Sequence, residues 1–229
     1  MNAADPAHCF TLCSARLRAL PSGALHWPEA ELLAVADLHL GKAERMARRG
    51  GALLPPYETR DTLLRLEADI SATAPARVVC LGDSFDDAAA AGALEEEVLL
   101  WLARLMSGRV WDWIAGNHDP GPLELAGSHR AELVLGPLVF RHIAVPGAAG
   151  EVSGHYHPKA RVALRGARLA RRCFLIDAAR AILPAYGTYT GGLATEAEAL
   201  AGLMGPEAVA VLTGARAQPV PMPRGRKAG

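Results

Sequence analysis

Clusters of carboxylate, amide and imidazole side chains follow short apolar runs at several points of the 229-residue chain. The clusters are Asp37-Leu38-His39, Gly82-Asp83-Ser84-Phe85-Asp86, Gly116-Asn117-His118-Asp119 and Gly154-His155-Tyr156-His157, with His142 at the end of a fifth run. Oxygen and imidazole ligands without a thiolate favour Mn, Fe, Zn or Mg over copper or iron–sulfur chemistry. The spacing of two in Asp37-x-His39 and His155-x-His157 places each pair on one side of an extended segment. Each pair could therefore bind one metal ion or two adjacent ions.

The apolar runs themselves predict the elements that position these clusters. Short β-strands are expected at residues 31–36, 77–81, 110–115, 138–141, 171–176 and 208–212. Helical periodicity predicts helices over residues 58–70 and 93–106. Strands alternate with helices early and dominate later, which favours a layered α/β sandwich. Because ligand sites of α/β sheets collect at the carboxyl ends of strands, the five clusters can converge on one cleft.

Composition restricts the class of protein. Hydrophobic residues make up 51% of the chain and charged residues 21%, so a sizeable core can form. The 24 basic and 24 acidic residues give a formal net charge of zero, which excludes a globally basic nucleic-acid binder. We expect one domain over residues 1–218 and a flexible basic tail over residues 219–229.

The sequence also bears on the cellular compartment. No apolar run has the length of a signal peptide or of a membrane span. The four cysteines are scattered and suit free thiols in a reducing compartment better than a disulfide framework. We therefore expect a cytoplasmic protein without membrane association.

The order of the motifs between Asp37 and His157 resembles that of the calcineurin-like metallophosphoesterase superfamily. The resemblance implies a four-layer αββα sandwich in which helices flank two mixed β-sheets. It implies a binuclear centre with one ion held by Asp37, His39, Asp83 and His157, and the other by Asp83, Asn117, His142 and His155. Asp83 would bridge the two ions. His118 matches the histidine that contacts phosphate and protonates the leaving group, and Asn117 would also contact phosphate.

Stretches outside the metal motifs extend the resemblance to one bacterial branch. Arg49-Gly50-Gly51, Leu54-Pro55, Leu183-Pro184-Ala185-Tyr186-Gly187 and Thr190-Gly191-Gly192 are similar to the ligase-associated DNA damage response endonucleases, the PdeM (MPE) branch. This similarity implies a manganese-dependent DNA endonuclease of nucleic acid repair, with Fe, Zn or Mg as other metals for the site. It also implies association with an ATP-dependent DNA ligase, a helicase and an exonuclease.

One position departs from the family pattern. Nucleases of the superfamily usually carry His three residues after the bridging Asp, where this chain has Asp86. A carboxylate repels phosphate unless it is protonated or metal-bound, whereas a histidine can contact phosphate or assist proton transfer. Asp86 is therefore kept as a candidate catalytic residue with His118 and Asp119. Asp119 either orients His118 or serves a local turn or cap.

The departure at Asp86 leaves other functions open. One alternative is a phosphomonoesterase, or a phosphodiesterase acting on small nucleotides or lipid precursors. Another is a non-catalytic, metal-bound interaction module. The second is disfavoured because every ligand position of the motif set is filled.

Basic residues adjoin two of the ligand clusters. Lys42 and Arg45 follow the first pair, and Lys159 and Arg161 follow the last, so these four are candidate contacts to nucleic-acid phosphates. No groove-reading helix is visible, which favours single-stranded or flexible DNA as the substrate. His129 competes with His142 for the fifth ligand position, but it follows a Gly-Ser turn and is expected to be an exposed loop residue.

Overall fold

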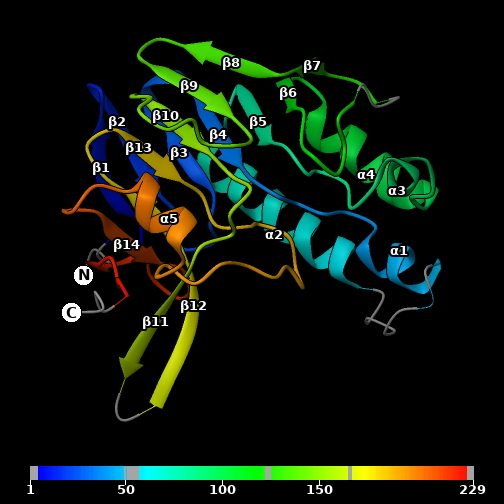
Figure 1. The fold of residues 1–229 in the computed structure, drawn as a ribbon. Helices are drawn as coiled ribbons and strands as arrows, with labels where there is room; N and C mark the ends of the chain where they lie inside the picture. Colours follow the sequence, from blue (N-terminus) through cyan, green and yellow to red (C-terminus); the bar gives the residue numbers. More distant parts are fainter. Residues whose placement is uncertain (1–4, 49, 51–56, 122–124, 165–166, 226–229) are drawn as a thin grey trace.

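The computed structural model describes residues 5–48, 50, 57–121, 125–164 and 167–225, and two β-sheets face each other within it (Figure 1). The first sheet has seven strands in chain order: β1 (His8–Leu12), β2 (Ala15–Ala19), β3 (Leu25–Trp27), β4 (Leu32–Val35), β5 (Arg77–Leu81), β6 (Val110–Ile114) and β7 (Ser128–Arg130). Strands β1 to β4 pair antiparallel, whereas β4 to β7 pair parallel. The sheet is therefore mixed, and the carboxyl ends of its parallel strands lie at one edge.

The second sheet has eight strands, and its order is β15-β14-β12-β13-β10-β9-β8 with β11 paired to β12. The strands are β8 (Glu132–Leu135), β9 (Leu138–Arg141), β10 (Glu151–Ser153), β11 (Lys159–Leu164), β12 (Ala167–Ile176), β13 (Arg180–Ile182), β14 (Val209–Leu212) and β15 (Gln218–Pro221). Strand β10 is parallel to both β9 and β13, and the remaining pairs are antiparallel. This sheet is also mixed.

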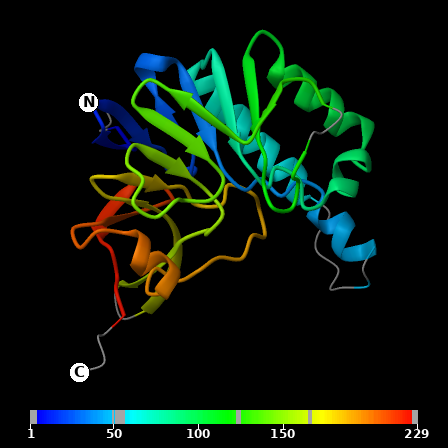
Figure 2. The same cartoon turned by 45° about the horizontal axis from the view of Figure 1, so that its top comes forward.

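Helices cover the outer faces of the two sheets. Those on the first sheet are α2 (Glu58–Thr73), α3 (Ala88–Gly92) and α4 (Glu96–Met106). Helix α1 (Lys42–Arg48) contacts α2 and α3, and a short 3₁₀ turn, η1 (Pro28–Ala30), precedes β4. Helix α5 (Glu198–Leu203) packs on the second sheet. Figure 2 shows α5 and the helices of the first sheet on opposite sides of the molecule. The order helix, sheet, sheet, helix confirms the expected αββα sandwich.

Alternation along the buried strands explains the layers. On β5, Val79 and Leu81 belong to the core between the sheets, while Val78 and Cys80 belong to the core under the helices. Successive side chains of a strand point to opposite faces, so a strand that is covered on both faces is apolar throughout. A third core lies beneath α5 and includes Leu200. None of the described helices is long and apolar enough to cross a membrane.

Most predicted elements occur close to their expected positions. The six predicted strands correspond to β4, β5, β6, β9, β12 and β14, and the two predicted helices correspond to α2 and α4. The tail was predicted to start at residue 219, whereas Gln218–Pro221 form β15 and Met222 is buried. Residues 226–229 of that tail lie outside the described residues. All four cysteines are free, with Cys80 and Cys173 buried and Cys9 and Cys13 exposed.

Candidate metal centre

The loops that follow five strands carry the predicted ligands to one place. Backbone hydrogen bonds join these loops: the Asp37 N–H donates to the Gly82 carbonyl (3.2 Å), and the His39 N–H donates to the Asp83 carbonyl (2.9 Å). The Gly154 N–H donates to the carbonyl of His142 (3.0 Å), which joins the loops after β9 and β10. The five clusters predicted from the sequence therefore do converge.

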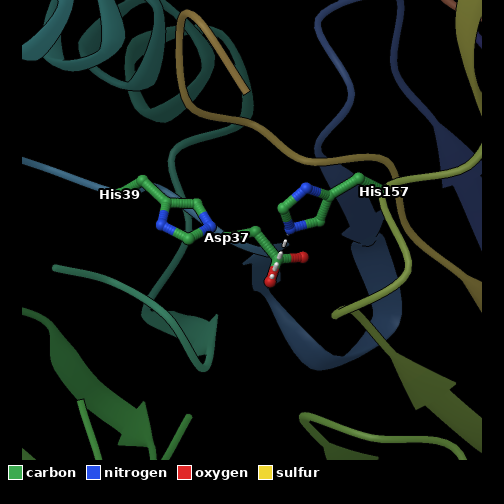
Figure 3. Close-up of side chains that lie close together, drawn as sticks. All are labelled: Asp37, His39 and His157. Atoms are coloured by element: carbon green, nitrogen blue, oxygen red, sulfur yellow. Dashed lines mark ion pairs between the residues drawn. The ribbon is translucent and has the colours of Figure 1, made fainter. Parts of the chain in front are cut away.

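One group of potential ligands consists of Asp37, His39 and His157, which Figure 3 shows around a common point. Their ligand atoms lie within 4.8 Å of one another. The shortest approach joins Oδ1 of Asp37 to Nε2 of His157 at 3.3 Å. Asp83 lies beside this group, with its Oδ2 4.0 Å from Nε2 of His39. The four residues are those that the family resemblance implies for one ion.

A second group consists of Asp83, His142 and His155, whose ligand atoms also lie within 4.8 Å of one another. Nε2 of His142 is 3.5 Å from Oδ2 of Asp83 and 3.2 Å from Nδ1 of His155. The same nitrogen is 2.9 Å from Oδ1 of Asn117. Oδ2 of Asp83 thus lies between the two groups, as a bridging carboxylate would.

The hydrogen bonding of these side chains tests whether metal ions fit here. Asp37 Oδ1, His39 Nε2 and His157 Nε2 are buried and make no hydrogen bond to any of the described residues. Buried polar atoms without a partner are rare in folded proteins and call for an explanation, such as a bound ion. Three orphaned ligand atoms that face one another are satisfied by a divalent cation that accepts oxygen and imidazole ligands. The residues present therefore fit the metal centre that the family implies.

The backbone at the ligands is unusual. Five ligand residues adopt left-handed φ values: Asp37 (54°), His39 (46°), Asp83 (46°), His155 (72°) and His157 (46°). Non-glycine residues adopt this conformation uncommonly, and it clusters at functional sites that the surrounding fold holds in place. The pairs therefore do not lie in the extended segments that their spacing predicts, and left-handed residues take the place of extended ones. The second pair is in fact divided, with His155 in one group and His157 in the other.

Two glycines allow the loops to approach one another. A Cβ at Gly82 would collide with the ring of His142, and a Cβ at Gly116 would collide with the backbone N and Oδ1 of Asp83. No larger residue fits at either position without displacing a candidate ligand.

Electrostatics keep Asp83 ionised. Burial alone would raise the pKa of this carboxyl, but hydrogen bonds from His142 and the His118 amide and the nearby imidazoles lower the pKa to about 2. Nδ1 of His142 donates to the carbonyl of Leu81 (2.9 Å), which directs Nε2 toward Asp83. A backbone acceptor of this kind fixes the tautomer of a ligating histidine.

Asp86 is wholly buried, and its carboxylate contacts three other side chains. Oδ1 lies 2.9 Å from Nδ1 of His39 and 3.7 Å from Nζ of Lys42, and Oδ2 accepts a short hydrogen bond from Arg45. Burial would raise the pKa of Asp86, but the hydrogen bond to His39 and the charges of Lys42 and Arg45 lower it to about 2. These contacts orient the ring of His39, and the catalytic role of Asp86 stays a prediction.

His118 is held by its backbone and by its ring. Its N–H donates to Oδ1 of Asp83 (2.8 Å), and its Nδ1 lies 2.9 Å from the carbonyl oxygen of Asp86. A carbonyl only accepts, so Nδ1 carries the proton and Nε2 is left for another partner. The ring stands edge-on to that of His39, with 5.2 Å between centroids. His118 lies beside the other candidate ligands, and with His39 and Asp86 it forms a third group whose ligand atoms lie within 4.8 Å of one another.

Asp119 fastens two loops of the site together. Oδ2 accepts the N–H groups of Ser84 (2.7 Å) and Phe85 (3.0 Å), and Oδ1 accepts the N–H of Gly116 (3.2 Å). Burial and the charge of Asp83 raise the pKa of Asp119 to about 6, although these backbone hydrogen bonds oppose the shift. Of the two roles left open by the sequence, the structure favours the local turn. The ring of His118 is oriented by Asp86 instead.

The four predicted phosphate contacts are distributed over two regions. Lys42 and Arg45 lie beside the centre, where both pair with Asp86. Lys159 donates from Nζ to the carbonyl of Thr190 (3.1 Å), and Arg161 lies exposed on β11. Only the first two therefore contact a residue that touches the ligands.

His129 does not reach the candidate centre. The sequence predicts a loop at His129, but the residue lies on β7. Its ring stacks on that of Trp113, with 6.5 Å between the centroids. His142, the residue predicted for the fifth position, lies in the group with Asp83 and His155.

Sequence reasoning missed the groups that orient the histidines. The carbonyls of Leu81 and Asp86 hold His142 and His118, and every residue type carries a carbonyl, so composition and spacing contain no signal for them. Asp86 itself was found through the family pattern, but its pairing with His39 depends on the folded loops.

Comparisons with known proteins agree with this geometry. A family model for calcineurin-like phosphoesterases matches residues 30–163, which is more than half of the chain. The crystal structure of the Pseudomonas putida nuclease MPE is similar, with a TM-score of 0.73 and 29% sequence identity. The match covers 93% of this chain and 100% of that one. A comparison with curated proteins gave no match.

Proposed function

Because the chain belongs to the calcineurin-like phosphoesterase family, whose members hydrolyse phosphate esters, we propose that it is a manganese-dependent endonuclease that cuts single-stranded DNA in nucleic acid repair. The observation that carries the proposal is the pair of ligand groups, with Asp83 in one group and 4.0 Å from His39 of the other, and with His118 beside them. The resemblance to the MPE branch is confirmed by a structural neighbour described as a nuclease, which matches over its whole length. Nucleic acid is therefore the favoured substrate class.

Two divalent cations would be held by the residues that the family pattern assigns to them. One ion would take Asp37, His39, Asp83 and His157, and the other would take Asp83, Asn117, His142 and His155. Such ions activate a water nucleophile and neutralise charge on the phosphate. Mixed oxygen and imidazole ligands suit Mn²⁺ well, and they also accept Fe, Zn or Mg.

The chain itself supplies the proton for the leaving oxygen. Because Nδ1 of His118 is engaged by the carbonyl of Asp86, Nε2 is the atom that can carry a second proton toward substrate. The backbone N–H of His118 donates to Asp83, so the general acid is hydrogen-bonded to the residue that would bridge the two ions. This hydrogen bond holds His118 at a fixed position relative to Asp83.

The environment of Asp86 is compatible with a nuclease. A free carboxylate here would repel a phosphodiester, but the Asp86 charge is offset by Lys42 and Arg45. The centre therefore presents no isolated negative charge from Asp86 to the substrate.

The cellular setting belongs to the same proposal. We include in it a functional association with an ATP-dependent DNA ligase, a helicase and an exonuclease. This association rests on the sequence resemblance to the repair branch. A cytoplasmic location is supported by the four free cysteines.

The experiment that tests this function offers Mn²⁺, Mg²⁺ or Zn²⁺ with closed circular single-stranded DNA or with p-nitrophenyl phosphate. We expect nicking of the circle with Mn²⁺ and little turnover of the monoester. A matched Asp37→Asn/His155→Ala variant, purified in the same way, excludes a contaminating nuclease. Turnover of the monoester with intact circles would overturn the nuclease proposal.

A further inference from the structure

A second concave surface lies beside the metal centre and carries an unusual excess of cations. A cleft of about 560 Å³ is lined by residues that include Asp61, Arg65, Lys159, Arg171, Arg172 and Thr188. These residues come from α2, from the β11–β12 hairpin, which projects from the body in Figure 1, and from the segment between β13 and α5. Of the eleven residues that line the cleft, four are basic and one is acidic, in a chain whose formal net charge is zero.

The segment around Tyr186 and Thr188 connects this cleft to the metal centre. The Gly187 N–H donates to the carbonyl of Asp37 (3.0 Å), a predicted ligand. The next residue, Thr188, lines the cleft and accepts a hydrogen bond at Oγ1 from Arg65 (3.1 Å). One short segment thus contacts both sites.

Three of the cations are held in place by neutral groups of this segment. Arg65 lies over the ring of Tyr186, 4.9 Å from its centroid, and donates to the Tyr186 carbonyl (2.8 Å). Arg172 donates to the carbonyl of Ala185 (3.2 Å), and Lys159 to that of Thr190 (3.1 Å). These acceptors fix the positions of the cations without neutralising their charge. The Nε atom of Arg65 is buried and has no hydrogen-bond partner in the part of the chain that the structure describes.

Acidic partners are scarce here. Asp61 lies 3.5 Å from Arg65, but within the described ranges no carboxylate comes within ion-pair distance of Lys159 or Arg172. Lys159 and Arg172 are directly opposite each other on β11 and β12, where like charges destabilise a sheet. Burial and the charge of Arg65 lower the pKa of Arg172 by more than the charge of Asp61 raises it. A bound anion would relieve this repulsion.

We propose that this cleft binds a backbone phosphate of the single strand, at a site separate from the phosphate that is cleaved. The inference rests on the proposed nuclease function, since it requires a strand long enough to span both sites. Arginine forks and a lysine suit phosphate oxygens, and an exposed cleft suits a flexible strand. Arg161 lies two residues from Lys159 on the same face of β11 and extends the basic surface along the hairpin.

The test uses the full chain with Mn²⁺ and compares two substrates. A single-stranded oligonucleotide reaches both sites, whereas bis(p-nitrophenyl) phosphate reaches only the metal centre. We expect Arg172→Gln to lower kcat/KM for the oligonucleotide about tenfold, through KM, because one charge-assisted contact is lost. Turnover of the small diester should not change. The dependence of log kcat/KM on log salt should become shallower by about 0.7, the value for one phosphate of a single strand.

Three further variants separate phosphate binding from a structural role. Arg172→Lys keeps the charge and should keep the salt dependence, while Lys159→Gln should reproduce the loss if Arg172→Gln fails to fold. Arg16→Gln removes an exposed charge from β2 and should leave kcat/KM unchanged for both substrates. Thermal melting followed by circular dichroism establishes that each variant is folded.

The outcomes distinguish the two proposals. If the wild-type protein hydrolyses the small diester but cuts no strand, the nuclease proposal fails and this inference fails with it. If the wild-type protein cuts the strand and both Arg172→Gln and Lys159→Gln retain its KM and salt dependence, only the second phosphate site is overturned. An equal loss on both substrates would also overturn it, because the residues would then act through the metal centre.

Discussion

Nδ1 of His39 lies 2.9 Å from Oδ1 of Asp86, and both side chains are buried. The pair fixes the ring of His39 so that Nε2 faces Asp83, which is 4.0 Å away. A carboxylate in contact with a ligating histidine raises its basicity and sets its orientation. Asp86 therefore has a defined structural task, although nucleases of the superfamily usually carry a histidine in its place.

Replacing this carboxylate by an amide should weaken metal binding. Asp86→Asn retains the shape of the side chain but removes the charge that orients His39 and that Lys42 and Arg45 share. We expect the affinity for Mn²⁺ to fall about 10- to 100-fold. Isothermal titration of the metal-free protein with Mn²⁺ measures the change.

The neighbouring acid provides the control for that substitution. Asp87 caps α3 by accepting the N–H of Ala90 (2.7 Å), and asparagine caps a helix about as well. Asp87→Asn should therefore bind Mn²⁺ as the wild type does. Equal affinities of Asp86→Asn and wild type would show that Asp86 does not support His39.

Loss of His118 should depend on the leaving group. A DNA strand releases an alkoxide that needs a proton, whereas p-nitrophenolate is stable without one. His118→Ala should slow DNA cleavage by about 10²–10⁴-fold, the usual contribution of a general acid, and slow bis(p-nitrophenyl) phosphate far less. Single-turnover rates on the two substrates give the ratio.

His129→Ala is the matched histidine variant, because His129 stacks on Trp113 and is not among the candidate ligands. It should leave both rates unchanged. If His118→Ala slowed the cleavage of both substrates equally, His118 would bind the phosphate and would not donate a proton to the leaving group.

Divalent metal should stabilise the fold, since three buried ligand atoms make no hydrogen bond without it. At a free Mn²⁺ concentration of about 100 times Kd, binding adds about 2.7 kcal/mol to the free energy of unfolding. For a chain of this size we expect Tm to rise by about 5–10 °C. Differential scanning calorimetry with Mn²⁺ and with a chelator measures the shift. A similar shift in Asp83→Asn would mean that the ion binds elsewhere.

The strand ends and their ligands could be predicted because each polar cluster follows an apolar run, as at Val78–Leu81 before Asp83. The hairpin of β1 and β2 could not, because its turn residues Cys13 and Ser14 adopt φ values of 45° and 73° without the usual glycine or asparagine. Strand β7 is only three residues long and largely polar, so periodicity gives no signal for it.

Within the site, residue types were predictable, whereas their conformation was not. The sequence identifies Asp37 and His39 as a pair, but the extended backbone inferred from their spacing is replaced by left-handed residues with φ of 54° and 46°. Hydrogen bonds from their backbone to Gly82 and Asp83 hold this conformation. Such long-range contacts exist only in the folded chain, and spacing along the sequence cannot reveal them.

Gly82 and Gly108 provide a test of this close approach, because both have a φ of 73° but only Gly82 has a neighbour within 4 Å of the position of a Cβ. Alanine at either position should cost about 1–2 kcal/mol of stability through its left-handed backbone. Gly82→Ala should cost more and should also weaken Mn²⁺ binding, since its Cβ collides with the ring of His142, whereas Gly108→Ala should bind normally. Thermal melting of the metal-free proteins and titration with Mn²⁺ measure the two effects. Identical behaviour of the two variants would mean that the loop after β5 moves aside freely, and that His142 does not depend on glycine there.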